Sequence, residues 1–134
     1  MNFYDNAVEV HLAAKSLCEN GHYRVSVCNS CLAIELFLKS KLHLVEGWEI
    51  YEFSHDVVNI YRHLLKKFTS KIDLTKMITM SRKYFNESRY PHSNTTIYTN
   101  EFAGEFLEYV TIIKSYVDDE CIATINDLQD KFRK

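Results

Sequence analysis

The chain has 134 residues, of which 46% are apolar and 25% are charged, and its formal net charge at pH 7 is −2. This composition is that of an ordinary globular domain with a sizeable core, and it excludes a disordered chain. A charge so close to zero gives no basic field of the kind that general duplex-DNA binders show. Three glycines and one proline are too few for a turn-rich β architecture. We therefore expect one all-α domain over residues 1–134.

No stretch of the sequence predicts a membrane segment. No apolar run approaches the roughly 18 residues that can span a bilayer. The N-terminal segment, Met1 to Asp5, has neither the positive start nor the apolar core of a signal peptide. We expect a cytoplasmic location.

Apolar residues at three- and four-residue steps predict two helices in the first third of the chain. The first covers about residues 2–20 and ends before Gly21, because glycine takes the left-handed C-cap conformation without steric cost. The second covers about residues 22–45 and is apolar on most of its circumference, which predicts a central position. Glu35 interrupts this apolar surface, and Lys39 follows one turn later in the order that favours an ion pair. Since a buried carboxylate needs a partner, Glu35 is either the structural partner of Lys39 or a carboxylate that lines a site.

Three further helices are expected after a connector. The third begins with Ser54 as its N-cap and Asp56 near the positive end of its dipole. A weaker fourth helix covers about residues 74–86. The last begins near Asn100, and its apolar face continues to the end of the chain, with residues 118–120 as a candidate joint. The predicted fold is one all-α bundle of about five helices.

The polar segment between the last two helices is the first place to look for a functional site. It contains Arg89 and His92 on either side of Pro91, the only proline of the chain, and we expect irregular backbone there. Functional residues concentrate on loops that rigid elements position. A structural role is the alternative, in which Arg89 pairs with Glu35 or Asp56 and fixes the loop to the bundle.

The cysteines and histidines predict no metal site. Cys28 and Cys31 form a Cys-x-x-Cys pair, but this pair lies inside the second helix. No second close pair and no histidine at zinc-finger spacing accompany it. We expect two thiols on a buried helix face, and neither a metal nor a cofactor.

Four short motifs follow one another along the chain in an informative order. They are the turn Asn20-Gly21-His22-Tyr23, the helical motif Ala33-x-Glu35-x-x-x-Lys39, the helix start Ser54-His55-Asp56 and the loop Arg89-Tyr90-Pro91. In this order they resemble the HEPN domain family, over nearly the whole chain. The resemblance implies a small up-and-down helical bundle that usually forms a homodimer, with two equivalent loops across a shared cleft.

The resemblance also implies a class of function. Many HEPN proteins are metal-independent ribonucleases of defence or toxin–antitoxin systems. Others pair with a minimal nucleotidyltransferase, and some only bind nucleotides or partner proteins. By this resemblance, the candidate residues for binding a nucleotide or RNA are Arg89, Tyr90, Glu35, Lys39 and His55.

The chain departs from the family in the ribonuclease motif, in which four to six residues separate an arginine from a histidine. Counted from Arg89, the histidine would fall at residues 94–96, which are Asn, Thr and Thr. Counted from Arg82, it would fall at residues 87–89, which are Glu, Ser and Arg. His92 follows Arg89 after only two residues.

The changed ribonuclease motif leaves three hypotheses about the function of the chain. RNA cleavage without a metal needs a base near the 2′-hydroxyl and a fixed cation at the phosphate. The leading hypothesis is a nucleotide- or RNA-binding module with weak or lost ribonuclease activity. The first alternative is an active endoribonuclease toxin that uses Arg89 and His92 as catalytic residues. The second is a non-catalytic adaptor that binds other proteins.

Overall fold

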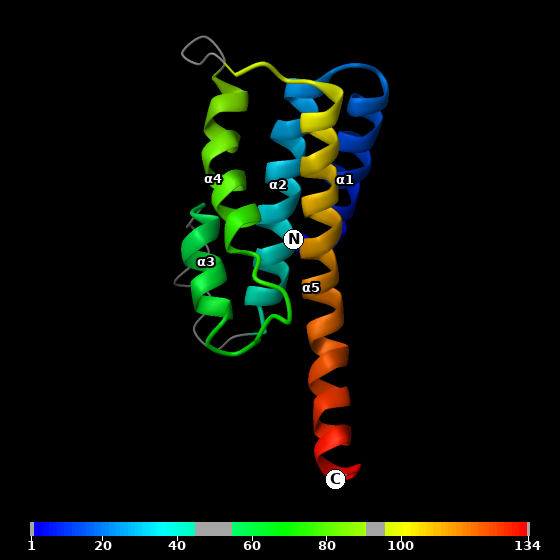
Figure 1. Cartoon of the computed structure of the whole chain (residues 1–134), viewed down its shortest axis with the longest axis vertical. Helices are drawn as coiled ribbons and strands as arrows, with labels where there is room; N and C mark the ends of the chain where they lie inside the picture. The colour runs from blue at the N-terminus through cyan, green and yellow to red at the C-terminus, as the bar shows by residue number, and fades with distance from the viewer. Residues whose placement is uncertain (1, 45–54, 91–95, 134) are drawn as a thin grey trace.

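The computed structural model describes residues 2–44, 55–90 and 96–133, and side chains of the last helix up to residue 118. Five helices and no strand occur in these residues, which confirms the predicted all-α bundle. The helices are α1 (Phe3–Glu19), α2 (Tyr23–Leu42), α3 (Val57–Leu64), α4 (Thr75–Arg89) and α5 (Asn100–Arg133) (Figure 1). Within the described part of the chain, no helix is both long enough and apolar enough to cross a membrane.

Helix α2 is the central element of the bundle. It contacts each of the other four helices, as its nearly continuous apolar surface predicts. The chain ascends along α1, descends along α2, ascends again along α4 and descends along α5 (Figure 1). The C-terminal ends of α1 and α4 therefore lie at the same end of the bundle (Figure 1).

The turn between α1 and α2 follows from Gly21. Its φ of 81° lies in the left-handed region, where glycine has no steric penalty. The amide of His22 donates to the carbonyl of Leu17 at 2.8 Å, and the amide of Gly21 donates to the carbonyl of Cys18 at 3.1 Å. This pair of bonds is a Schellman motif. The predicted end of the first helix is confirmed.

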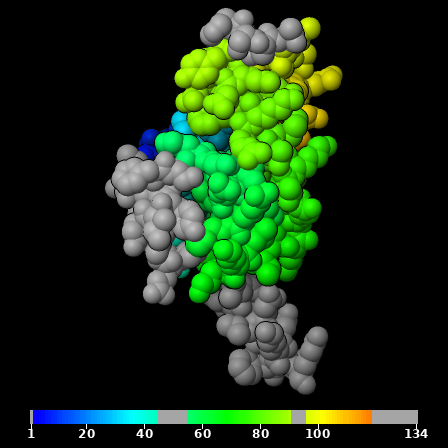
Figure 2. Space-filling view, turned by 90° about the vertical axis from the view of Figure 1, so that its left-hand side faces the viewer, coloured from blue at the N-terminus to red at the C-terminus, as the bar shows by residue number. Residues whose placement is uncertain are grey.

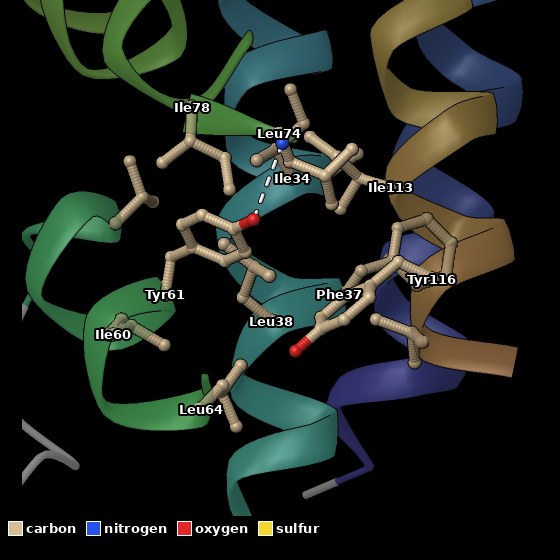
Figure 3. Close-up of a cluster of buried hydrophobic side chains, with 14 of the residues drawn as sticks. Ile34, Phe37, Leu38, Ile60, Tyr61, Leu64, Leu74, Ile78, Ile113 and Tyr116 are labelled. Carbon is tan, nitrogen blue, oxygen red and sulfur yellow. Dashed lines mark hydrogen bonds between the residues drawn. The ribbon is translucent and has the colours of Figure 1, made fainter. Parts of the chain in front are cut away.

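The main core lies where α2 packs against α3, α4 and α5 (Figure 3). Phe37 and Leu38 of α2 are fully buried there, and so are Ile60 and Leu64 of α3. The hydroxyl of Tyr61 accepts a hydrogen bond from the amide of Leu74 at 3.3 Å. A smaller cluster, built around Val27, Cys31, Ala103 and Phe106, fills the other end of the bundle.

Three predicted features of the later helices differ from the structure. Helix α4 continues to Arg89 and does not end near residue 86. Asp56, not Ser54, is the N-cap of α3, since its side chain accepts a hydrogen bond from the amide of Val58 at 3.0 Å. Ser54 itself lies outside the described residues. Helix α5 runs through residues 118–120 without a joint.

A tertiary contact explains why α4 continues. The last carbonyls of a helix have no partner within the helix. Nη1 of Arg24, on α2, donates to the carbonyl of Ser88 at 2.5 Å. Ser88 is fully buried and brings this turn close to α2. The positive guanidinium also suits the negative end of the helix dipole.

Candidate functional site

A cleft of about 470 Å³ lies between α2, the start of α3 and α4. Its volume is within the usual range of small-molecule sites. Figure 2 looks onto the side of the molecule that α3 and α4 form. The polar side chains of its wall are those of Glu35, His55, Asp56, Ser81, Arg82, Asn86 and Arg89.

Glu35 is the most deeply buried acid of this wall. Its side chain is only 5% exposed. Oε2 lies 3.1 Å from Nζ of Lys39 and 3.1 Å from Nδ1 of His55. Nζ of Lys39 and Nδ1 of His55 are 3.5 Å apart. The three side chains form one network, in which the cation of Lys39 balances the charge of the buried carboxylate.

His55 connects this buried network to the solvent. Its side chain is 74% exposed, whereas that of Lys39 is 6% exposed. The contact between Nδ1 and the carboxylate is shorter than the contact between Nδ1 and Lys39. This geometry favours the tautomer in which Nδ1–H donates to Glu35, because a bare lone pair would repel the carboxylate. Nε2 of His55 then has no hydrogen-bond partner among the residues that the structure describes.

A second ion pair lies on the opposite wall. Nη1 of Arg82 is 3.6 Å from Oδ1 of Asp56. The same oxygen accepts the hydrogen bond that caps α3, so Asp56 both caps this helix and pairs with Arg82. The Arg82 side chain is still 51% exposed, and a partly solvated guanidinium keeps free donors for an anion.

Arg89 is the second arginine of the cleft. It is the last residue of α4 and lies seven residues, or about two helical turns, after Arg82. Its guanidinium lies 4.4 Å from the ring centre of Phe85, and Nη2 donates to the side chain of Asn86 at 3.5 Å. Within the described residues it pairs with neither Glu35 nor Asp56, so the predicted structural pairing is wrong. Its donors are held by a stacking contact and a long hydrogen bond, which leaves them available to a ligand.

The structure brings together some of the residues that the sequence singled out. Glu35, His55 and Arg89 all line the cleft, and Lys39 lies directly behind Glu35. Tyr90 is the C-cap of α4 and is 54% exposed, but it is not part of the cleft wall. His92 lies outside the described residues.

The sequence analysis did not assign Arg82 or Phe85 to the site. Both lie with Arg89 on one face of α4, because residues three, four and seven positions apart share a helix face. The spacing of these three residues is visible in the sequence. It places them on one helix face only if α4 continues to residue 89. A helix that ends at residue 86 leaves Arg89 without a fixed relation to Arg82.

The nearest buried thiol is not a reactive group of the cleft. Ser81 lines the cleft, and Cys31 lies behind it in the core. Burial raises the pKa of Cys31 to about 12, with a smaller opposing effect from its hydrogen bond to Ser81. The thiol therefore stays protonated near neutral pH and is a poor nucleophile. The buried half of the predicted Cys-x-x-Cys pair is a packing residue, and Cys28 is half-buried.

The chemistry of the cleft is that of an anion-binding site next to a hydrogen-bond acceptor. Two arginines supply planar donors on α4, and a buried carboxylate and an exposed imidazole face them from α2 and the start of α3. In the described part of the chain, no three His, Cys, Asp or Glu side chains are grouped as a metal ion requires.

Most of the chain is similar to known proteins. A family model of the HEPN domain matches residues 2–120. Among solved structures, TT1696 from Thermus thermophilus matches with a TM-score of 0.77 and 23% sequence identity, over 90% of this chain and 99% of that chain. Identity at this level shows a common fold and nothing further. No curated protein matches the sequence.

Proposed function

Because the chain belongs to the HEPN domain family, we propose that it is a nucleotide- or RNA-binding module whose cleft holds a phosphate group. Family membership supports a role related to nucleotides or RNA. The observation that carries the proposal is the pair of arginines, Arg82 and Arg89, on one wall of a nucleotide-sized cleft. Arginine binds phosphate through its planar, multidentate donors.

The charges in and directly behind the cleft also support the binding of a phosphate group. The cleft and the side chain directly behind it combine three cations, Arg82, Arg89 and Lys39, with the carboxylates of Glu35 and Asp56. Each carboxylate has one of these cations as a partner, and Arg89 has no carboxylate partner among the described residues. A phosphate therefore meets a net positive local field in a chain whose overall charge is negative.

The test is the binding of a short, 3′-labelled RNA with or without a 5′-phosphate, measured by fluorescence anisotropy. We expect the phosphorylated RNA to bind more tightly. The Arg82→Ala and Arg89→Ala variants should each weaken binding by roughly tenfold or more, since a charge-assisted hydrogen bond contributes about 1.5–3 kcal/mol. Arg62→Ala, which removes an exposed arginine of α3 outside the cleft, is the matched control. Equal binding by all four proteins would reject the proposal.

A metal-independent endoribonuclease is the second candidate function. It is favoured by the exposed imidazole of His55, which a carboxylate orients in the same cleft as two arginines. A histidine held in this way can exchange a proton with a 2′-hydroxyl while an arginine stabilises charge on the phosphate. The hypothesis from the sequence assigned the catalytic roles to Arg89 and His92. Both His55 and His92 therefore need to be tested.

Cleavage of a mixed RNA in the presence of a chelator distinguishes the two functions. Activity that depends on Arg89 and on either His55 or His92 would establish the enzyme. RNA binding without cleavage, from folded protein, is the result that we expect.

The family resemblance also implies partners, which we propose on that ground alone. These are a second copy of the chain and a minimal nucleotidyltransferase of a toxin–antitoxin or defence system. Light scattering on the purified protein tests the homodimer. Co-purification with a nucleotidyltransferase encoded next to this chain tests the second partner. A cytoplasmic location and a single domain over residues 1–134 remain predictions.

A further inference from the structure

The carboxylate of Glu35 has one oxygen without a hydrogen-bond partner. Oε2 makes both of its contacts, with Lys39 and with His55. Oε1 is buried and accepts no hydrogen bond from any group in the described part of the chain. An ionised carboxylate has acceptor sites on both oxygens, and buried polar atoms are nearly always paired. Among the buried polar atoms of the described residues that lack a hydrogen-bond partner, Oε1 belongs to a residue of the cleft wall, so a ligand in the cleft can supply the missing donor.

This oxygen belongs to a side chain of the proposed binding cleft. Glu35 lines the cleft from α2, and Arg82 and Arg89 line it from α4. The cleft thus offers cationic donors on one wall and an unused acceptor on the other. Leu32 on α2 and Phe85 on α4 add apolar surface to the cleft. This surface suits a ligand that has an uncharged part as well as an anionic group.

An inorganic anion fits this arrangement poorly. Phosphate or sulfate can bind the arginines, but an acceptor-only anion gives nothing to Oε1 and is repelled by the Glu35 carboxylate. A ligand that carries both an anionic group and a neutral hydrogen-bond donor can bind the arginines and also donate to Oε1. Nucleotides have this combination, because their phosphate is joined to ribose hydroxyls and, in several bases, to an exocyclic amine.

We propose that Oε1 of Glu35 accepts a hydrogen bond from a neutral donor of a bound nucleotide, while Arg82 and Arg89 hold its phosphate. Glu35 is then a specificity-determining residue that selects a nucleotide over inorganic phosphate. Lys39 and His55 are positioning residues, since both contact Oε2 and thereby fix the carboxylate in place. The inference rests on the proposed function and adds to it the residue that distinguishes a nucleotide from inorganic phosphate.

The ligand reaches Oε1 by a small movement at the edge of the cleft. Oε1 has almost no contact with solvent, but the adjacent His55 ring is 74% exposed. Rotation of an exposed side chain is fast and needs no change in the backbone. A shift of this ring or of the carboxylate opens the acceptor to a donor in the cleft.

Calorimetric titration with a ligand series tests the inference on the unmodified protein. The probes are AMP, 2′-deoxy-AMP, 3′-deoxy-AMP, IMP and inorganic phosphate. The deoxy compounds each lack one ribose hydroxyl, and IMP lacks the exocyclic amine. We expect AMP to bind more tightly than phosphate, and one of the three analogues to lose about 5- to 150-fold in affinity, the effect of leaving a buried acceptor unpaired. The analogue that loses affinity identifies the donor.

Glu35→Gln then assigns the effect to this residue. In that variant, the difference in affinity between AMP and the weakened analogue should be smaller than in the unmodified protein, because an amide oxygen accepts a weaker hydrogen bond than a charged carboxylate oxygen. Glu9→Gln is the control, as it removes an exposed carboxylate of α1 far from the cleft wall. Thermal unfolding shows whether Glu35→Gln is folded, and the ligand series on the unmodified protein decides the inference if it is not.

Two negative outcomes are distinguishable. If phosphorylated RNA binds through the arginines but AMP and all its analogues bind no better than phosphate, the inference is wrong and the proposed function stands. If neither RNA nor any nucleotide binds, both are wrong.

Discussion

Tyr61 shows how one polar atom connects separate segments of the bundle. Its ring packs edge-on against Tyr116 of α5, with ring centres 6.0 Å apart. Its hydroxyl accepts from the amide of Leu74, which directly precedes α4 (Figure 3). A single side chain of α3 therefore contacts α5 and fixes the start of α4.

The Tyr61→Phe substitution should destabilise the fold without changing its shape. It removes the acceptor of a buried backbone amide, which costs about 1–3 kcal/mol of unfolding free energy. Urea denaturation measures the loss. Tyr23→Phe, at a half-buried tyrosine of α2, is the control, and an equal effect of both substitutions would contradict the assigned role of the Tyr61 hydroxyl.

Because of Cys31, we expect the folded protein to lose stability at alkaline pH. Burial raises its pKa in the folded state to about 12, above the value of 9.0 for an unperturbed thiol. The folded state thus binds the thiol proton more tightly than the unfolded state. The resulting stability is fully present below pH 9 and is lost as the pH rises from about 9 to 12.

Urea unfolding at about pH 8 and about pH 10.5, on either side of the unfolded-state pKa, measures this effect. The decrease in unfolding free energy between the two pH values should be smaller in Cys31→Ala than in the unmodified protein. It should not vanish, because burial also raises the pKa of Tyr98 and Tyr109. Cys28→Ala, at a half-buried thiol of the same helix, should keep the decrease of the unmodified protein.

At the scale of the element, the C-terminal turn of α4 contributes both to the stability of the bundle and to the candidate site. Arg24 of α2 donates to the carbonyl of Ser88, and the next residue, Arg89, lines the cleft. The position of one phosphate-binding candidate therefore depends on an arginine that is not itself part of the cleft wall.

Arg24→Met should loosen this turn. The substitution keeps most of the side-chain length but removes the charged donor, at a cost of about 1.5–3 kcal/mol in unfolding free energy. Binding of phosphorylated RNA should weaken as well, because Arg89 is no longer held. Arg62→Met on α3 controls for the lost charge. Unchanged stability together with unchanged binding would show that the contact is not needed.

At the scale of the whole molecule, the bundle depends on α2 and on part of α5. The buried residues of α5 that the structure describes lie between Ala103 and Val117. Asp118 adds a hydrogen bond from the hydroxyl of Tyr4 at 2.7 Å and an ion pair with Lys114 at 2.7 Å. The later residues of α5 extend along the helix axis beyond the other helices (Figure 1), and the family model ends at residue 120.

A chain that ends at residue 120 should fold into the same bundle. It keeps every described buried side chain of α5 and the contacts of Asp118. Circular dichroism should show a cooperative thermal transition within about 4 °C of that of the full chain. A chain that ends at residue 109 is the control, since it loses Val110 and Ile113 from the core and should not fold. Loss of the transition in the longer truncation would mean that the extension is part of the stable domain.

Local features of the sequence determined the helices and the family. The apolar steps of three and four residues fix which segments are helical, and Gly21 fixes the end of the first helix, because both effects act within one or two turns. The Glu35–Lys39 pair follows from the same spacing. The order of the motifs was sufficient for the HEPN resemblance, which the family model confirms.

Tertiary packing alone decided the extent of α4 and the composition of the cleft. The contact between Arg24 and Ser88 joins residues 64 positions apart, so the local polar pattern at residues 86–89 could not reveal that the helix continues. The meeting of Glu35, His55 and Arg82 depends on how α4 and the start of α3 pack on α2. That packing is set by the summed burial of many core side chains, which no short segment of the sequence encodes.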